Sequence, residues 1–116
     1  MKTTKAQFSR FKKEFLRCVE VFGLKSWRVD FLHEHLNNAY AIISCDYPNA
    51  VATVSMTDEI ASCNKDKFIP EVVAKHECIH LLLYPLVYEG RARYAVGEDI
   101  DAQWEHITRT IEKIDF

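Results

Sequence analysis

Hydrophobic side chains recur every three or four residues between residues 4 and 22, a spacing that places them on one face of an α-helix. The members of this face are Phe8, Phe11, Phe15, Cys18, Val19 and Phe22. Thr3 or Thr4 suits the N-cap position, and Gly23 suits the left-handed residue that often follows a helix. The pattern predicts an N-terminal helix whose phenylalanines belong to the hydrophobic core.

The hydrophobic spacing then changes to two, as in β-strands with one buried face. Strands are predicted over residues 27–36, 39–45 and 50–56, separated by turn formers at 37–38 and 46–49. Because short turns usually join antiparallel neighbours, we expect a three-stranded antiparallel meander. In this arrangement residues 50–56 form an edge strand along which an extended peptide can lie.

Two further helices are predicted in the second half of the chain. Pro70 suits the first turn of a helix, and Pro85 is expected to end that helix. The predicted elements are a helix over 70–83, a connection over 84–96 and, after Gly97, a helix over 98–114 with the apolar stripe Ile100, Trp104, Ile107, Ile111 and Ile114. Together the elements predict an α+β fold, with residues 1–116 in a single domain.

The helix that begins at Pro70 contains the sequence H-E-C-I-H at residues 76–80, which has the H-E-x-x-H spacing of zinc-binding helices. Residues four apart lie one turn above each other, so His76 and His80 can point at one ion. Glu77 is rotated by about 100° and can take a proton from a water beside the metal. Such a site needs a third protein ligand and an open fourth position. The alternative is a core helix whose histidines make only hydrogen bonds.

Cys78 and Ile79, between the two histidines, and Leu81 and Leu82, after them, are uncharged, as a helix buried on its other faces requires. Val73 and Ala74, ahead of the motif, also fit a zinc-binding helix. The stretch resembles the longer pattern of zincin metallopeptidases. The order of elements over residues 25–114 resembles a minimal gluzincin, such as the small zincin-like proteins of phages and mobile elements. The resemblance implies a zinc ion whose third ligand is an acidic residue on the helix after the motif.

Three acidic residues of the last helix are candidates for the third ligand. In the repressor-cleaving metallopeptidases of mobile elements the ligand begins a pattern E-x-x-A-N-x-F, which residues 98–104 resemble loosely, with Glu98 in the ligand place. In the phage proteins the pattern E-x-x-V-x-x-L-E gives both Glu98 and Glu105 a counterpart. The two lie two turns apart on one side of the helix, with Asp101 between them. Glu98 is the first candidate, Glu105 the alternative and Asp101 the third; another acid can orient a zinc-bound histidine.

These residues predict a zinc-dependent endopeptidase. His76 and His80 hold the ion, and Glu77 is the general base toward zinc-activated water, later passing the proton to the leaving amine. The group that stabilises the oxyanion is left open among Tyr88, Arg91, Arg93, Tyr94 and His106. The alternative is a zincin-fold binding protein of a phage or mobile element, with little or no peptidase activity.

The peptidase prediction implies a protein or peptide partner, and charge and composition argue against dedicated nucleic-acid or membrane partners. A net charge of −2 argues against a dedicated nucleic-acid binder, and the basic run over residues 2–17 is typical of a solvated helix face. A peptidase that acts near DNA, with this run on phosphates, is a third possibility. No apolar run is long enough to cross a membrane, so no membrane partner is expected.

Cysteine usage and the N-terminus favour a cytoplasmic protein. The first residues lack the apolar segment of a signal peptide, and the four cysteines show no C-x-x-C spacing. We therefore expect reduced thiols, with Cys63 the most exposed. His33 and His35 would share one face of a strand, but no third ligand lies nearby in sequence, so a metal role there is disfavoured.

Overall fold

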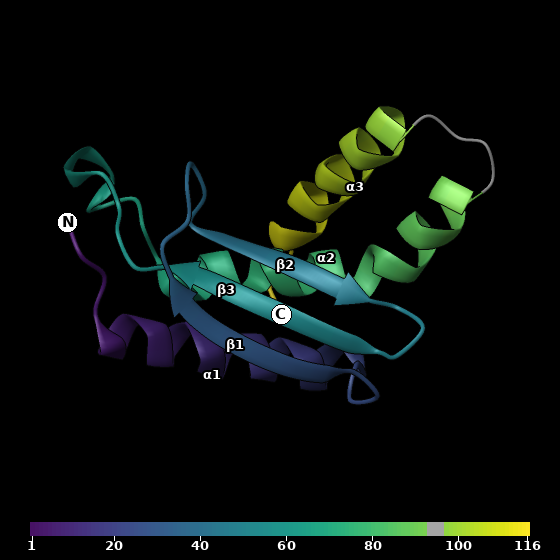
Figure 1. Ribbon diagram of the computed structural model, residues 1–116, viewed down its shortest axis with the longest axis horizontal. Helices are drawn as coiled ribbons and strands as arrows, with labels where there is room; N and C mark the ends of the chain where they lie inside the picture. The colour runs from purple at the N-terminus through teal and green to yellow at the C-terminus, as the bar shows by residue number, and fades with distance from the viewer. Residues whose placement is uncertain (93–96) are drawn as a thin grey trace.

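The computed structural model describes residues 1–92 and 97–116, which form an α+β fold. The elements in chain order are α1 (Lys5–Phe22), β1 (Arg28–Glu34), β2 (Ala41–Asp46), β3 (Val51–Thr57), the 3₁₀ turn η1 (Ser62–Asn64), α2 (Pro70–Ala92) and α3 (Gly97–Glu112). Helices α1 and α2 lie on one face of a three-stranded sheet, and α3 packs against α2 (Figure 1). The α+β prediction is confirmed at this level.

The N-terminal helix has the predicted boundaries and caps. Thr4 is the N-cap, and its side chain and backbone exchange hydrogen bonds with Gln7 in a capping box. Gly23 ends the helix with a φ of 70°, the left-handed conformation that glycine adopts without steric cost. Phe11, Phe15 and Cys18 are fully buried, so the apolar face is in the core as expected.

The strands are close to their predicted positions, but their order is β1-β3-β2. Strand β3 pairs antiparallel with β2 and parallel with β1. The prediction of an antiparallel meander is therefore wrong, and so is the placement of residues 50–56 at an edge, because β3 is the central strand. The edges of the sheet are β1 and β2.

The residue content of β3 explains its central place. Ala52, Val54 and Met56 are fully buried, and the strand carries no charged side chain. The outer strands carry charged side chains such as Asp30 and Asp46, which suit sheet edges. Alternating hydrophobicity reports which face of a strand is buried but carries no information about which strand is its neighbour.

The core lies between the sheet and its two covering helices. Its fully buried members are Phe11, Phe15 and Cys18 from α1, Ala52, Val54 and Met56 from β3, and Ala74, Cys78 and Leu81 from α2. The motif helix is thus packed into the core along one side, and its histidine face points toward α3. This packing gives the candidate site a rigid floor.

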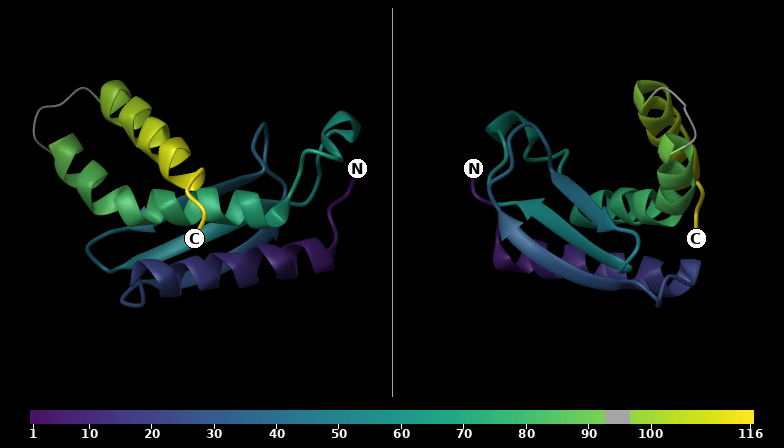
Figure 2. Two further views of the ribbon diagram at one scale, coloured as in Figure 1. Left: turned by 180° about the vertical axis from the view of Figure 1, so that it is seen from behind. Right: turned by 45° about the vertical axis from the view of Figure 1, so that its right-hand side comes forward.

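Helix α2 continues through Pro85 to Ala92, so the prediction that Pro85 ends it is wrong. A proline inside a helix removes one backbone hydrogen bond and bends the helix without necessarily ending it. Figure 2 shows the last part of α2 turned away from its first part. Residues 84–92, predicted as a connection, are helical, and Val87 is buried at 5% exposure.

Two other expectations concern membranes and cysteines. In the described ranges no helix is long and apolar enough to span a membrane. All four cysteines are free, and Cys63 is exposed as predicted, whereas Cys18 and Cys78 are buried in the contact between α1 and α2.

The helical continuation past Pro85 gives the first prediction. Val87→Ala should lower the free energy of unfolding by about 1–3 kcal/mol, because it removes buried methyl groups from a packed site. Leu86→Ala is the control: Leu86 is 68% exposed, so its change should stay within about 0.5 kcal/mol. Urea unfolding of both variants and of the wild type, all metal-free, measures these changes in the free energy of unfolding. Equal costs would contradict helical packing of this segment.

Candidate metal centre

His76 and His80 lie one turn apart on the face of α2 that α3 covers. Their side chains are 23% and 10% exposed, so both are largely removed from solvent. Trp104 of α3 donates its indole N–H to the backbone carbonyl of His80 over 3.1 Å, and its ring lies 4.5 Å from the imidazole. This contact sets how closely α3 approaches the histidines.

Three donor atoms from the two helices converge at this face. Glu105 of α3 places its carboxylate oxygens 3.1 Å from Nε2 of His76 and 3.0 Å from Nε2 of His80. The two Nε2 atoms are 3.2 Å apart. His76, His80 and Glu105 are also a group whose donor atoms all lie close enough together to hold one metal ion.

The hydrogen-bond partners of the two Nδ1 atoms determine the tautomer of each imidazole ring. Nδ1 of His76 lies 2.6 Å from the carboxylate of Glu112, which can only accept, so Nδ1 carries the proton. The hydroxyl of Thr108 donates to the carbonyl of Trp104 and so accepts from Nδ1 of His80 at 3.2 Å. In the neutral rings both Nε2 atoms therefore present lone pairs toward Glu105.

This donor set fits a zinc ion. Zinc–nitrogen and zinc–oxygen bonds of about 2.1 Å in a tetrahedron separate neighbouring donors by about 3.4 Å, slightly more than the observed 3.0–3.2 Å. Two lone pairs and a carboxylate facing one another repel unless a cation lies among them. Burial, and next the adjacent His76, lower the pKa of His80, which favours the neutral imidazole that metals bind.

The structure does not bring the other proposed ligands to this point. Glu98 is exposed in the first turn of α3, seven residues and therefore about 10 Å of helix axis from Glu105. Asp101 is paired with Arg91 of α2 at an exposed position. Glu105 is therefore the third ligand that the geometry favours, and Arg109 contacts its carboxylate at 3.2 Å.

Glu77 lies beside the two histidines and is 7% exposed. Within residues 1–92 and 97–116, no group donates a hydrogen bond to its carboxyl. Burial, and then the negative charges of Glu105 and Glu112, raise the pKa of Glu77 to about 8. A buried acid without a protein partner, next to a candidate metal-binding face, is free to exchange protons with a water or a substrate.

Sequence reasoning missed Glu112 and Thr108, which orient the two histidines. A signal for Glu112 was present, since it follows Glu105 by seven residues, as Glu105 follows Glu98. That spacing places all three acids on one side of a helix. Thr108 is fully buried but gives no comparable signal, because a threonine inside a helix is common.

The residues predicted as candidates for stabilising an oxyanion lie at different places in the structure. Tyr88 packs on Tyr47 at 5.0 Å, and Arg91 is occupied by Asp101. His106 is exposed on α3. Arg93 and Tyr94 lie outside the described residues. None of the described candidates forms a hydrogen bond or ion pair with His76, His80 or Glu105.

His33 of β1 and His35, which follows that strand, have different neighbours. Nε2 of His33 lies 2.6 Å from the hydroxyl of Thr3 and its ring stacks on Phe8. His35 lies near Asp58 and Glu59, but Lys2 already places its ammonium near both carboxylates, at 4.0 and 3.5 Å.

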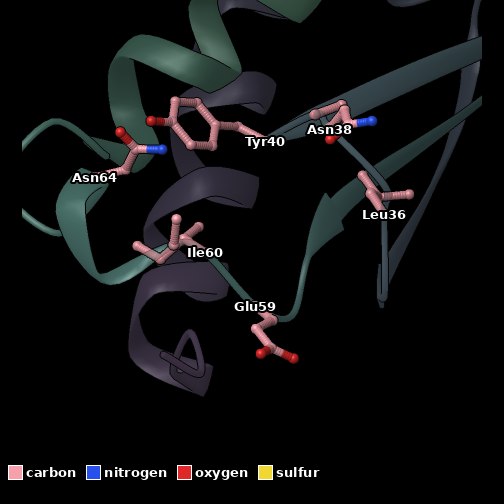
Figure 3. Close-up of a pocket in the computed structure, with 8 residues that line it drawn as sticks. Leu36, Asn38, Tyr40, Glu59, Ile60 and Asn64 are labelled. Atoms are coloured by element: carbon pink, nitrogen blue, oxygen red, sulfur yellow. The ribbon is translucent and has the colours of Figure 1, made fainter.

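Two cavities meet at Tyr40. The inner cavity, about 330 Å³ in volume, reaches His76, Glu77 and Glu112. The outer cavity, about 410 Å³, is lined by residues of the loops 36–40 and 59–64 (Figure 3). Although larger, the outer cavity is not lined by His76, Glu77, His80 or Glu105, whereas the inner cavity reaches His76 and Glu77.

No protein-family model, curated protein or solved structure matches this chain. The functional argument therefore rests on the geometry of the site and on the chemistry of its side chains.

The ligand set gives the second prediction. Glu105→Gln should lower zinc affinity by more than about a hundredfold, since removing a group that only orients a ligand already costs 10- to 100-fold. Glu98→Gln is the matched control and should bind zinc normally. Metal analysis and melting curves with and without EDTA measure both, because zinc bound to the folded state raises its stability. Zinc loss in Glu98→Gln but not in Glu105→Gln would reverse the assignment.

The buried acid gives the third prediction, for metal-free protein. Since the pKa of Glu77 is raised from 4.5 to about 8, the folded state keeps a proton that the unfolded state loses in this window. Its contribution to stability is therefore lost as pH rises from 4.5 to 8. Glu77→Gln removes this loss, so its stability relative to wild type should increase by about 3 kcal/mol between pH 5 and 8. A constant difference in urea unfolding would show that Glu77 is ionised in the folded protein.

Proposed function

We propose that this protein is a zinc-dependent endopeptidase. One observation carries the proposal: Nε2 of His76, Nε2 of His80 and the carboxylate of Glu105 converge within 3.2 Å, next to the buried carboxyl of Glu77. Two histidines, a carboxylate and an adjacent acid without a protein partner form the minimum set for hydrolysis at a metal.

Each side chain has a separate role in this proposal. His76, His80 and Glu105 hold the ion, while Glu112 and Thr108 keep both Nε2 atoms free of protons. Bound zinc supplies a Lewis acid for a peptide carbonyl and for the attacking water. Glu77 accepts a proton from that water and delivers it to the leaving amide nitrogen.

The ionisation state of Glu77 follows from charge balance. It must be a carboxylate to accept a proton, and burial beside two acids opposes this in metal-free protein. A divalent cation next to it favours the charged form. Metal binding and activation of the base are thus coupled.

Strand β2 is the edge beside which a substrate peptide fits. It pairs with β3 on one side only, and its first residue, Ala41, lines the inner cavity together with Glu77. An extended peptide that added to this edge would run past the ligand face of α2. This replaces the earlier expectation for residues 50–56, which lie in the centre of the sheet.

Cleavage gives the fourth prediction. Glu77→Gln should retain one zinc per chain and lose activity by about a hundredfold or more, because it cannot accept a proton. Metal content and the hydrolysis of a quenched fluorescent peptide library measure the two properties. The control is Glu98→Gln, which should retain both. Full cleavage by Glu77→Gln would remove it from the mechanism, and a zinc-loaded wild type that binds peptides without cleaving them would favour a binding protein.

A further inference from the structure

The inner cavity has an apolar wall that remains accessible. It lies between the start of β2 and the first turns of α2, and Tyr40, Ile69, Val72 and Val73 form its sides. Ile69 and Val72 are 47% and 55% exposed although they are aliphatic. An accessible apolar wall next to the general base offers a surface on which a substrate side chain can be buried.

One cation lines the same cavity. Lys67 lies three residues before Pro70, the first residue of α2. His76 lies six residues after Pro70, which is about 9 Å along the helix axis. In the part of the chain that the structure describes, no carboxylate lies within ion-pair distance of Lys67. The charge of its ammonium is thus available to a ligand, and it lies toward the N-terminal end of α2.

The two features together define a ligand: an apolar side chain followed by a carboxylate. We propose that the inner cavity selects peptides with an aliphatic or aromatic residue next to the cleaved bond and a carboxylate that pairs with Lys67. This inference rests on the proposed peptidase function and makes Ile69 and Lys67 its specificity-determining residues. The carboxylate is either an acidic side chain or the C-terminus of the peptide.

Peptide series test the inference with the zinc-loaded protein. Leu or Phe in place of Ala at the apolar position should raise kcat/KM by about tenfold or more. Glu in place of Gln at the following position should raise it by about fivefold, as expected for a partly exposed ion pair. Peptides that end at this position are also compared with a free C-terminal carboxylate and with a C-terminal amide. This comparison distinguishes recognition of the C-terminus from recognition of an acidic side chain.

Two variants with matched controls assign the preference to residues. Lys67→Glu should invert the preference for acidic over basic residues, whereas Lys65→Glu, in the same loop but not lining the cavity, should not. Ile69→Ala should reduce discrimination between Leu and Ala at least about threefold. Leu16→Ala removes a similarly exposed aliphatic side chain, 50%, from α1 and should leave discrimination unchanged.

The outcomes separate this inference from the proposed function. Cleavage without either preference, or identical effects of Lys67→Glu and Lys65→Glu, would overturn the inference and leave the peptidase proposal standing. In the absence of cleavage, the same peptides are titrated against zinc-loaded Glu77→Gln by fluorescence anisotropy. Binding with both preferences would support the cavity as a ligand site, and binding without them would overturn it.

Discussion

The approach of α3 to α2 is the constraint on which the site depends. The ligand histidines come from one helix and the carboxylate from the other, so the donor atoms meet only if the helices keep their spacing. Trp104 holds that spacing through its bond to the carbonyl of His80, and Thr108 fills the buried contact beside it. The opposite side of α2 is packed into the core beneath the sheet. The contact between α3 and α2 therefore also fixes the position of Glu105 relative to the sheet.

In the proposed site, the distribution of charge favours a bound cation. Glu77, Glu105 and Glu112 lie around two imidazoles that are neutral when they bind metal, and Arg109 is the one cation with a contact to Glu105 among the described residues. Burial, and then the negative charges of Glu105 and Glu112, raise the pKa of Glu77. A divalent ion would relieve this repulsion, and it would do so where the donor atoms are closest.

The parts of the site that depend on local sequence were predictable, and those that depend on packing were not. His76, Glu77 and His80 follow from the spacing of one helix, and the capping residues of α1 follow from local preferences. The choice between Glu98 and Glu105 depends on where two helices cross, which seven-residue periodicity leaves undecided. The prediction of strand order is wrong for a similar reason. Strand β3 is central because it pairs with β1, a strand distant from it in sequence, as well as with β2. The prediction that Pro85 ends α2 is wrong because a proline removes only one backbone hydrogen bond, and the helix continues to Ala92.

The tryptophan that anchors α3 also makes the site visible to spectroscopy. Its ring lies against His80, whereas Trp27 lies on the other side of Tyr84, whose ring contacts both tryptophans. A paramagnetic ion such as Co²⁺ or Cu²⁺ held by His80 would quench the emission of Trp104 more strongly than that of Trp27. The chain therefore carries an intrinsic optical reporter of metal occupancy and an internal reference for it.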